Sequence, residues 1–310
     1  MSTTEIAALA DAIVLHHSAT FGARPHGDAH SVELVPQPTP EATRTEPAYL
    51  AALLACSRLG FIAVDAECLA QAWQRQTART GQFDAAHWPD APQDFGLTPD
   101  PAKSFPACPR ALGLYGVLPT AEWVGSMARA GVPTVQLRFK SENKDAIRAE
   151  VRAAVEAVKG TNALLFINDH WREAIDAGAY GVHVGQEDLD GLEGDDLNAI
   201  RASGLRLGVS THGYAEMVRA HAVQPSYIAL GAVFPTTLKK MATAPQGMAR
   251  LQAYVRLMQA YPLVAIGGIA AEQFGEVAAT GVGSIAVVRA LVNAPDPEAA
   301  ARDLMARLTQ

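Results

Sequence analysis

The sequence predicts an α/β protein in which eight parallel strands and their helices close into a (β/α)8 TIM barrel. From Leu112 onward, short runs rich in Val, Ile and Leu alternate with stretches of helical periodicity. Such nearly continuous apolar runs are typical of parallel strands that helices cover. Eight strand–helix units in about 200 residues fit a small barrel.

The eight expected strands share this apolar character. They are LGLYGVL (112–118), TVQLR (134–138), LLFIN (164–168), GVHVG (181–185), RLGVS (206–210), YIALG (227–231), LVAIGG (263–268) and SIAVV (284–288). Between the second and third strands, Ile147, Val151 and Val155 recur at helical spacing, and Gly160 ends that helix. A doubly wound open sheet is the alternative, which is disfavoured because no G-x-G-x-x-G opens the first unit.

Residues 1–110 lack this alternation and are expected to form a mostly helical and irregular N-terminal extension. Residues 48–60 and 66–81 predict two amphipathic helices that end at glycines. Residues 25–47 predict a loop or linker, and six prolines between 88 and 110 forbid a long helix there. We expect a chain that starts near Pro109 to fold and to stay at least partly active without this extension.

Composition limits the classes of protein. The net charge of −7 argues against nucleic-acid binding, which needs dense Lys and Arg. Cys56, Cys68 and Cys108 are an odd number without metal-ligand spacing, so we expect reduced thiols in a cytoplasmic protein, with neither disulfides nor structural zinc. Neither a secretory signal nor a run of about 18 apolar residues is found, so no membrane partner is expected. The oligomeric state stays open, with a homo-oligomer among the options.

Polar residues and one pair of glycines lie where the expected strands end, which is where a barrel of this kind forms its active site. These residues are Gln136, Arg138 and Lys140, then Asn168 and Asp169, then residues 186–188, Ser210, Thr236 and Lys239, and Gly267–Gly268.

The residue types at this rim indicate chemistry with phosphates. Asp169 and Asp188 are hard oxygen ligands of the kind Mg²⁺ prefers when substrate phosphates complete its coordination. Arg138, Lys140 and Lys239 are cations suited to a diphosphate. The glycine pair would let backbone amides approach a separate monophosphate.

Each feature also has an ordinary structural interpretation. The glycine pair is compatible with a tight turn, and Lys239 with a solvent-exposed loop. Asp188 is compatible with a helix N-cap. His183 lies inside an apolar strand, where a hydrogen-bonded core histidine competes with a catalytic one. The functional interpretation rests on the convergence of these features on one rim.

Over about residues 112–310, the chain resembles the thiamine-phosphate synthase (thiamine-phosphate pyrophosphorylase) family. The resemblance is carried, in order, by VQLRFK, FINDHWREAIDAGAYGVHVGQEDL, LGVSTH, YIALGAVFPTTLKK, VAIGGI and IAVV. It implies a Mg²⁺-dependent transferase of thiamine biosynthesis. A hydroxymethylpyrimidine diphosphate would lose pyrophosphate by dissociation, and the nitrogen of a thiazole phosphate would attack the exposed methylene carbon.

The resemblance also implies roles for individual residues. Asp169 and Asp188 match the Mg²⁺ ligands. Substrate binding matches Gln136, Arg138, Lys140, Asn168, Ser210, Thr236, Lys239, Gly268, Val288 and Arg289, of which Arg138, Lys140, Ser210 and Lys239 are also the expected catalytic residues.

Two positions depart from the family pattern. Leu238 stands where the family has a hydroxyl residue, and Arg289 stands where it often has Ser, which puts efficiency in doubt more than reaction type. Three alternatives stay open: a thiazole tautomerase-like isomerase, a non-catalytic regulator that binds thiamine precursors, and a bifunctional protein. The last follows from a faint likeness of residues 57–73 to a pyrimidine-phosphate kinase helix, and otherwise the role of residues 1–110 is open.

Overall fold

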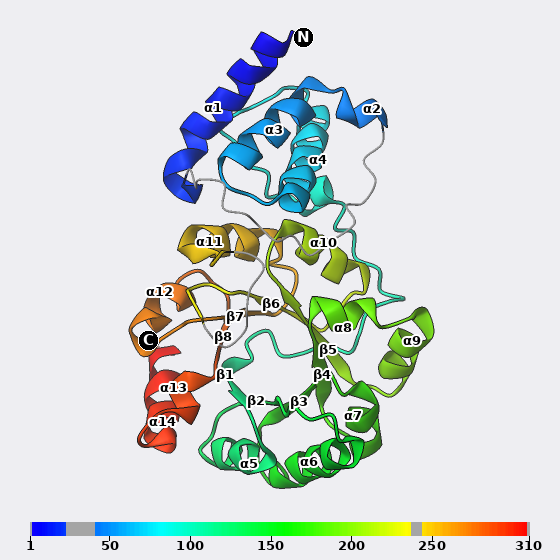
Figure 1. Cartoon of the computed structure of the whole chain (residues 1–310), viewed down its shortest axis with the longest axis vertical. Helices are drawn as coiled ribbons and strands as arrows, with labels where there is room; N and C mark the ends of the chain where they lie inside the picture. The colour runs from blue at the N-terminus through cyan, green and yellow to red at the C-terminus, as the bar shows by residue number, and fades with distance from the viewer. Residues whose placement is uncertain (1, 23–40, 237–243, 309–310) are drawn as a thin grey trace. The chain divides into compact units, whose positions relative to one another are not determined.

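In the computed structural model, which describes residues 2–22, 41–236 and 244–308, eight parallel strands form a closed barrel in sequence order (Figure 1). Pairing of the last strand with the first closes the ring. The barrel prediction is therefore confirmed and the open sheet is wrong. The strands are β1 (Gly113–Leu118), β2 (Thr134–Leu137), β3 (Leu164–Asn168), β4 (Gly181–Val184), β5 (Arg206–Thr211), β6 (Tyr227–Leu230), β7 (Leu263–Ile266) and β8 (Ser284–Val287).

The chain folds into two compact units, of which the barrel is one. The barrel unit comprises residues 100–211, 223–236 and 259 onward. Its helices are α5 (Ala121–Arg129), α6 (Lys144–Ala157), α7 (Trp171–Ala177), α8 (Gln186–Asp190), α9 (Gly194–Ala202), η2 (Ala271–Gln273), α12 (Phe274–Ala278), α13 (Arg289–Val292) and α14 (Pro297–Leu308). Helix α6 is the helix predicted between the second and third strands. Asn143 caps its start, and Gly160 follows its end with φ of 77°.

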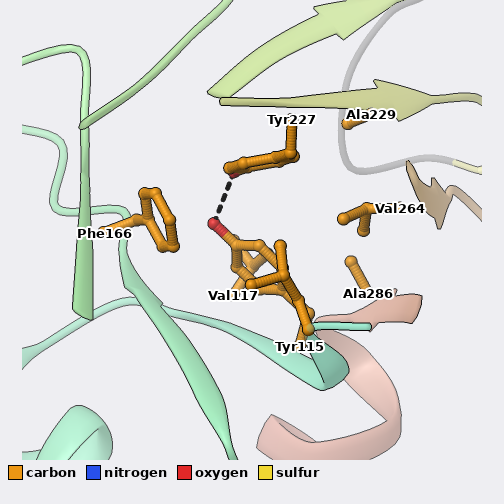
Figure 2. Packing of buried hydrophobic residues seen from close by; sticks show 8 residues of the cluster. Tyr115, Val117, Phe166, Tyr227, Ala229, Val264 and Ala286 are labelled. Carbon is orange, nitrogen blue, oxygen red and sulfur yellow. Dashed lines mark hydrogen bonds between the residues drawn. The ribbon is translucent and has the colours of Figure 1, made fainter. Parts of the chain in front are cut away.

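Aromatic rings fill the barrel interior, and glycines on other strands make room for them. The rings of Tyr115, Phe166 and Tyr227 converge there (Figure 2). A Cβ at Gly181 would lie 2.5 Å from the Phe166 ring, and one at Gly208 would lie 2.1 Å from the Tyr227 ring. Since interiors are packed to crystal-like density, β4 and β5 need glycine at these positions.

The segment before β1 belongs to the barrel unit. The Phe105 N–H donates to the Gln224 carbonyl at 3.1 Å, and the Arg201 guanidinium lies over the Phe105 ring. Further on, the Leu112 N–H donates to Ser284 Oγ at 2.7 Å, which fastens the start of β1 to β8. Phe105 thus anchors the Pro-rich segment to the barrel unit.

The second unit joins the N-terminal residues to two later helices. It comprises residues up to 99 together with 212–222 and the described part of 237–258. Its helices are α1 (Thr3–Phe21), α2 (Glu41–Arg44), α3 (Pro47–Arg58), α4 (Ala63–Thr80), η1 (Pro92–Phe95), α10 (Tyr214–Ala222) and α11 (Gly247–Leu257). The two predicted N-terminal helices correspond to α3 and α4. The boundary between the units therefore differs from the 110/111 division, and independent folding of residues 111–310 stays a prediction.

Aromatic and polar contacts hold this second unit together. The Trp88 Nε1–H donates to the Tyr214 hydroxyl at 3.0 Å, and the Phe95 ring stacks on Tyr214. Arg250 donates to the Gly60 carbonyl at 3.1 Å and lies over the Phe61 ring. Helices α10 and α11, which follow β5 and β6 in the chain, thus share a core with the N-terminal residues.

Two further expectations concern the cysteines and the membrane. All three cysteines are free thiols, as predicted. Among the described helices, none is long and apolar enough to cross a membrane.

Asp65, in the first turn of α4, has a buried carboxyl group that contacts the start of α10. Its Oδ1 accepts the Ala215 N–H at 2.9 Å, and Gly213 leaves the space that the carboxyl occupies. Burial outweighs that hydrogen bond and raises the pKa of Asp65 from 3.8 to about 7. The folded chain therefore holds this proton more tightly than the unfolded chain does, so this group's contribution to stability falls as the pH rises from about 4 to about 7.

We predict that Asp65→Asn removes this part of the pH dependence of stability. Asn keeps the acceptor oxygen for Ala215 but does not titrate. The free energy of unfolding of the variant minus that of the parent chain should therefore rise by roughly 3 kcal/mol between pH 4 and pH 7. Denaturant unfolding at several pH values measures this difference. A constant difference across the range would contradict the assignment.

Candidate active site

Three predicted site residues meet where β2 and β3 end. Gln136, in β2, is buried, and its Nε2 donates to Asn168 Oδ1 at 2.7 Å. Asn168 is the last residue of β3, and its Nδ2 donates to the carboxylate of Asp169. The row Gln136–Asn168–Asp169 is therefore one connected group at the barrel rim.

Asp169 has a left-handed backbone conformation, with φ of 63°. Its N–H donates to the His183 carbonyl at 2.9 Å, so the residue still pairs with β4 while the chain turns away from β3. Asp is one of the few side chains that adopt this region at moderate cost. The conformation places the carboxylate beside Asn168 instead of continuing the strand.

Ser210 and His183 form a second polar group on the neighbouring strands β5 and β4. His183 is buried, and its Nε2 lies 2.8 Å from Ser210 Oγ. The buried Gln186 at the start of α8 donates from Nε2 to the Ser210 carbonyl at 2.8 Å. His183 is thus a hydrogen-bonded interior histidine, as one of the two interpretations held, and its partner is a predicted site residue.

The expected metal ligands come from adjacent strands. β3 pairs with β4, with Asn168 opposite His183, so Asp169 and Asp188 follow neighbouring strand ends. Asp188 is exposed in the first turn of α8, whose N-cap is Gly185 and has no side-chain cap hydrogen bond. Asp188 is therefore not the N-cap residue, although it lies in the acidic first turn of this helix.

The donor set fits a magnesium ion shared with a substrate. No group of three His, Cys, Asp or Glu suited to a metal occurs in the part of the chain that the structure describes. Two carboxylates at one rim are too few for an all-protein cage. They are what Mg²⁺ uses when phosphate oxygens and water complete its octahedron.

Two of the predicted cations, Arg138 and Lys140, follow β2. Arg138 is half-buried, and its N–H donates to the Leu118 carbonyl at 2.7 Å. Lys140 is exposed two residues further on. Lys239 and the departure Leu238 fall in 237–243, outside the described residues.

The glycine pair after β7 accommodates another loop. The Phe234 N–H donates to the Gly267 carbonyl at 2.9 Å, so the chain after β6 runs alongside the end of β7. A Cβ at Gly268 would lie 2.5 Å from the Pro235 carbonyl oxygen and 2.7 Å from that of Phe234. Gly267 and Gly268 have φ of 101° and 67°, which favours glycine as well. This loop carries the half-buried Thr236.

The remaining predicted residues follow β8. Val288 is the N-cap of α13 and is half-buried, whereas Arg289 is exposed at the first position of that helix. Both lie at the same end of the barrel strands as the groups above, because the eight strands are parallel.

Sequence reasoning missed Tyr115 and Tyr227. Their hydroxyls lie 2.8 Å apart in the barrel interior, and Tyr115 donates to Gln136 Oε1 at 2.9 Å. Tyr227 also lies 2.6 Å from His183 Nδ1. A tyrosine in an otherwise apolar strand indicates an interior hydrogen bond, since a buried hydroxyl needs a partner.

These features define a class: a TIM-barrel enzyme whose strand ends carry carboxylates, amides and cations for a phosphorylated substrate. The sequence profile of thiamine monophosphate synthase matches residues 116–291. A thiamine-phosphate synthase of Neisseria meningitidis is 53% identical over 203 residues, which are 66% of this chain and 98% of the relative. That of Salmonella typhimurium is 52% identical, over 65% of this chain and 94% of the relative.

A solved structure of a protein with the same activity has a similar fold. Thiamine phosphate pyrophosphorylase from Pyrococcus furiosus superposes with a TM-score of 0.57 at 27% identity, covering 64% of this chain and 97% of that one. The chain belongs to the thiamine monophosphate synthase family. It is accordingly a transferase of thiamine biosynthesis with thiamine-phosphate synthase activity, as the sequence resemblance predicts.

We predict that Gly268→Ala lowers activity at least tenfold. The added methyl group would meet the Phe234 and Pro235 carbonyls, and the loop bearing Thr236 would have to move. Gly275→Ala is the matched control, because Gly275 lies in α12 and a Cβ added there would have no atom within 4 Å. The control should keep full activity and gain about 0.5–1 kcal/mol of stability. Full activity of Gly268→Ala would show that this close approach is not required.

Proposed function

We propose that this barrel joins a hydroxymethylpyrimidine diphosphate to a thiazole phosphate in a reaction that depends on Mg²⁺. The products are thiamine phosphate and pyrophosphate. The observation that carries the assignment of residues is the connected row Gln136–Asn168–Asp169, which sets two amide groups beside one carboxylate at the rim. Amides can bind the pyrimidine while the carboxylate serves the diphosphate end.

We assign the diphosphate to the charged groups of the rim. Asp169 and Asp188 would hold Mg²⁺, which supplies positive charge to the leaving pyrophosphate. Arg138, Lys140 and Lys239 would neutralise the remaining phosphate oxygens. Charges held around the bound diphosphate would stabilise the negative charge that develops as the carbon–oxygen bond breaks.

The other substrate groups follow from position. Ser210 and Thr236 are assigned to the reacting centre, and Gly268, Val288 and Arg289 to the thiazole phosphate. Once pyrophosphate has left, the cationic pyrimidine methylene accepts the thiazole nitrogen. That step needs no protein nucleophile, so the protein contributes mainly by orienting both substrates.

Two alternatives lack this support. A thiazole isomerase would have no use for the carboxylates of Asp169 and Asp188 together with the cations assigned to the diphosphate. A non-catalytic regulator would bind the precursors without releasing pyrophosphate. Location in the cytoplasm stays a prediction, and the oligomeric state stays open.

The decisive experiment mixes the purified chain with pyrimidine diphosphate and thiazole phosphate, with Mg²⁺ or with a chelator. We expect thiamine phosphate and pyrophosphate in equal amounts, and only with Mg²⁺. Thiazole isomerisation without pyrophosphate release would support the isomerase instead. Binding of both substrates without any product would support the regulator.

We predict that Asp188→Asn raises the Mg²⁺ concentration needed for half-maximal turnover and lowers the rate on the order of 10²-fold. Asn keeps the shape of the side chain but removes the charge. The melting temperature without ligand should hardly change, because Asp188 is exposed.

Glu187→Gln is the matched control for this variant. Glu187 is exposed, lies next to Asp188 in the same turn of α8, and loses the same charge. Its Mg²⁺ dependence should stay that of the parent chain. An unchanged Mg²⁺ dependence in Asp188→Asn would contradict the metal assignment.

A further inference from the structure

One continuous chain of hydrogen bonds crosses the barrel interior and connects Ser210 to Asp169. Its members come from β1, β2, β3, β4, β5 and β6, so it joins side chains from most of the ring. In order, the contacts are Ser210 Oγ to His183 Nε2 (2.8 Å), His183 Nδ1 to Tyr227 (2.6 Å), Tyr227 to Tyr115 (2.8 Å), Tyr115 to Gln136 Oε1 (2.9 Å), Gln136 Nε2 to Asn168 Oδ1 (2.7 Å), and Asn168 Nδ2 to Asp169.

The direction of every bond follows from the carboxylate at one end. Asn168 donates from Nδ2 to the Asp169 carboxyl group and accepts with Oδ1 from Gln136. Gln136 then donates with its own NH₂ group and leaves Oε1 facing Tyr115. An amide oxygen only accepts, so the Tyr115 hydroxyl proton is committed to that oxygen.

Counting the available protons in the same way gives the donors and acceptors in the other half of the row of hydrogen bonds, from Tyr115 to Ser210. Tyr115 has no second proton, so Tyr227 must donate to Tyr115. Tyr227 then has no proton left for His183, and the bond between them requires a proton on His183 Nδ1. A neutral imidazole carries one N–H, so Nε2 is a bare acceptor that takes the Ser210 hydroxyl proton.

Burial keeps the middle of the chain protonated. It raises the pKa of both Tyr115 and Tyr227, for which desolvation is the largest cause. Neither phenol therefore becomes an acceptor-only phenolate at neutral pH. Which group donates in each of these hydrogen bonds therefore follows from the residue types and from the order in which they are bonded.

We propose that Tyr115, Tyr227 and His183 are positioning residues that make Ser210 a hydrogen-bond acceptor toward the substrate. With its proton turned to His183, the Ser210 oxygen has only lone pairs to offer. It would then accept from an exocyclic amino group and would find no donor in an oxo group at the same place. The inference rests on the proposed function for the identity of the substrate, an aminopyrimidine diphosphate. It attributes the preference for a substrate with an amino group over one with an oxo group to the hydrogen bonds inside the barrel.

The first test needs no substrate. ¹⁵N-histidine labelling of the full chain, with His183→Gln to assign the signal, reports which ring nitrogen carries the proton at neutral pH. We expect the proton on Nδ1 in the parent chain. We expect it to move to Nε2 in Tyr227→Phe, where Nδ1 loses its acceptor. A parent His183 with a proton on Nε2 would overturn the proposed chain, whatever the enzyme acts on.

The second test compares two substrates. Turnover of the aminopyrimidine diphosphate and of its oxo analogue gives a ratio of kcat/KM values. In Tyr227→Phe, kcat/KM for the amino substrate should fall about tenfold, and the preference over the oxo analogue should fall by a similar factor. Loss of folding alone would lower both substrates equally and leave the ratio unchanged.

Tyr254→Phe is the matched control. Tyr254 is also buried, and its hydroxyl donates to Gln246 Oε1 at 2.9 Å, outside this chain of hydrogen bonds. It should keep the parent ratio. A parent ratio in Tyr227→Phe with the His183 proton on Nε2 would overturn the positioning role. If the parent chain turned over neither pyrimidine while the Nδ1 proton was observed, the proposed function would fail and the hydrogen-bond chain would stand.

Discussion

The hydrogen bond between Tyr115 and Tyr227 is the contact on which the barrel interior depends. It joins β1 to β6, which are not neighbours in the ring, so it spans the interior instead of following the sheet. A buried hydroxyl without a partner costs free energy, and each phenol satisfies the other here. The Gln136 amide and the His183 ring are held by the same pair. Packing of the core and orientation of the rim are therefore one arrangement.

Glycines, which have no side chain, make room for this arrangement. Gly181 and Gly208 leave the volume that the Phe166 and Tyr227 rings occupy, since even one methyl group at either position would overlap a ring. At the rim, Gly268 lets another backbone pass in the same way. Glycine thus acts in this barrel through close approach, and the rings and loops that approach carry the polar groups.

Much of the architecture could be predicted from local pattern. The eight strands could be located to within about two residues, because strands buried on both faces are apolar along their whole length. The ends of those strands located Gln136, Asn168, Asp169 and Ser210, because parallel strands deliver their C-terminal residues to one edge.

Other features depend on contacts that are distant in the sequence. Tyr115 and Tyr227 resemble ordinary strand residues until the ring closes and brings them together. The division into units was also out of reach, because the cluster around Trp88 includes Tyr214, which lies 126 positions further on. Helix α1 did have a local signal that was missed, the capping box of Ser2 and Glu5.

That division has a consequence for synthesis on the ribosome. Asp65 and Ala215 are bonded at a separation of 150 positions, and Arg250 reaches the Leu59 carbonyl across 191. Helices α1, α3 and α4 emerge first, yet their core is incomplete until α10 and α11 have been made. At typical elongation rates, Phe61 and Trp88 lack their contacts with Tyr214 and Arg250 for roughly 10 to 30 s. The core of this unit therefore forms late in synthesis, because it needs residues that are far apart in the sequence.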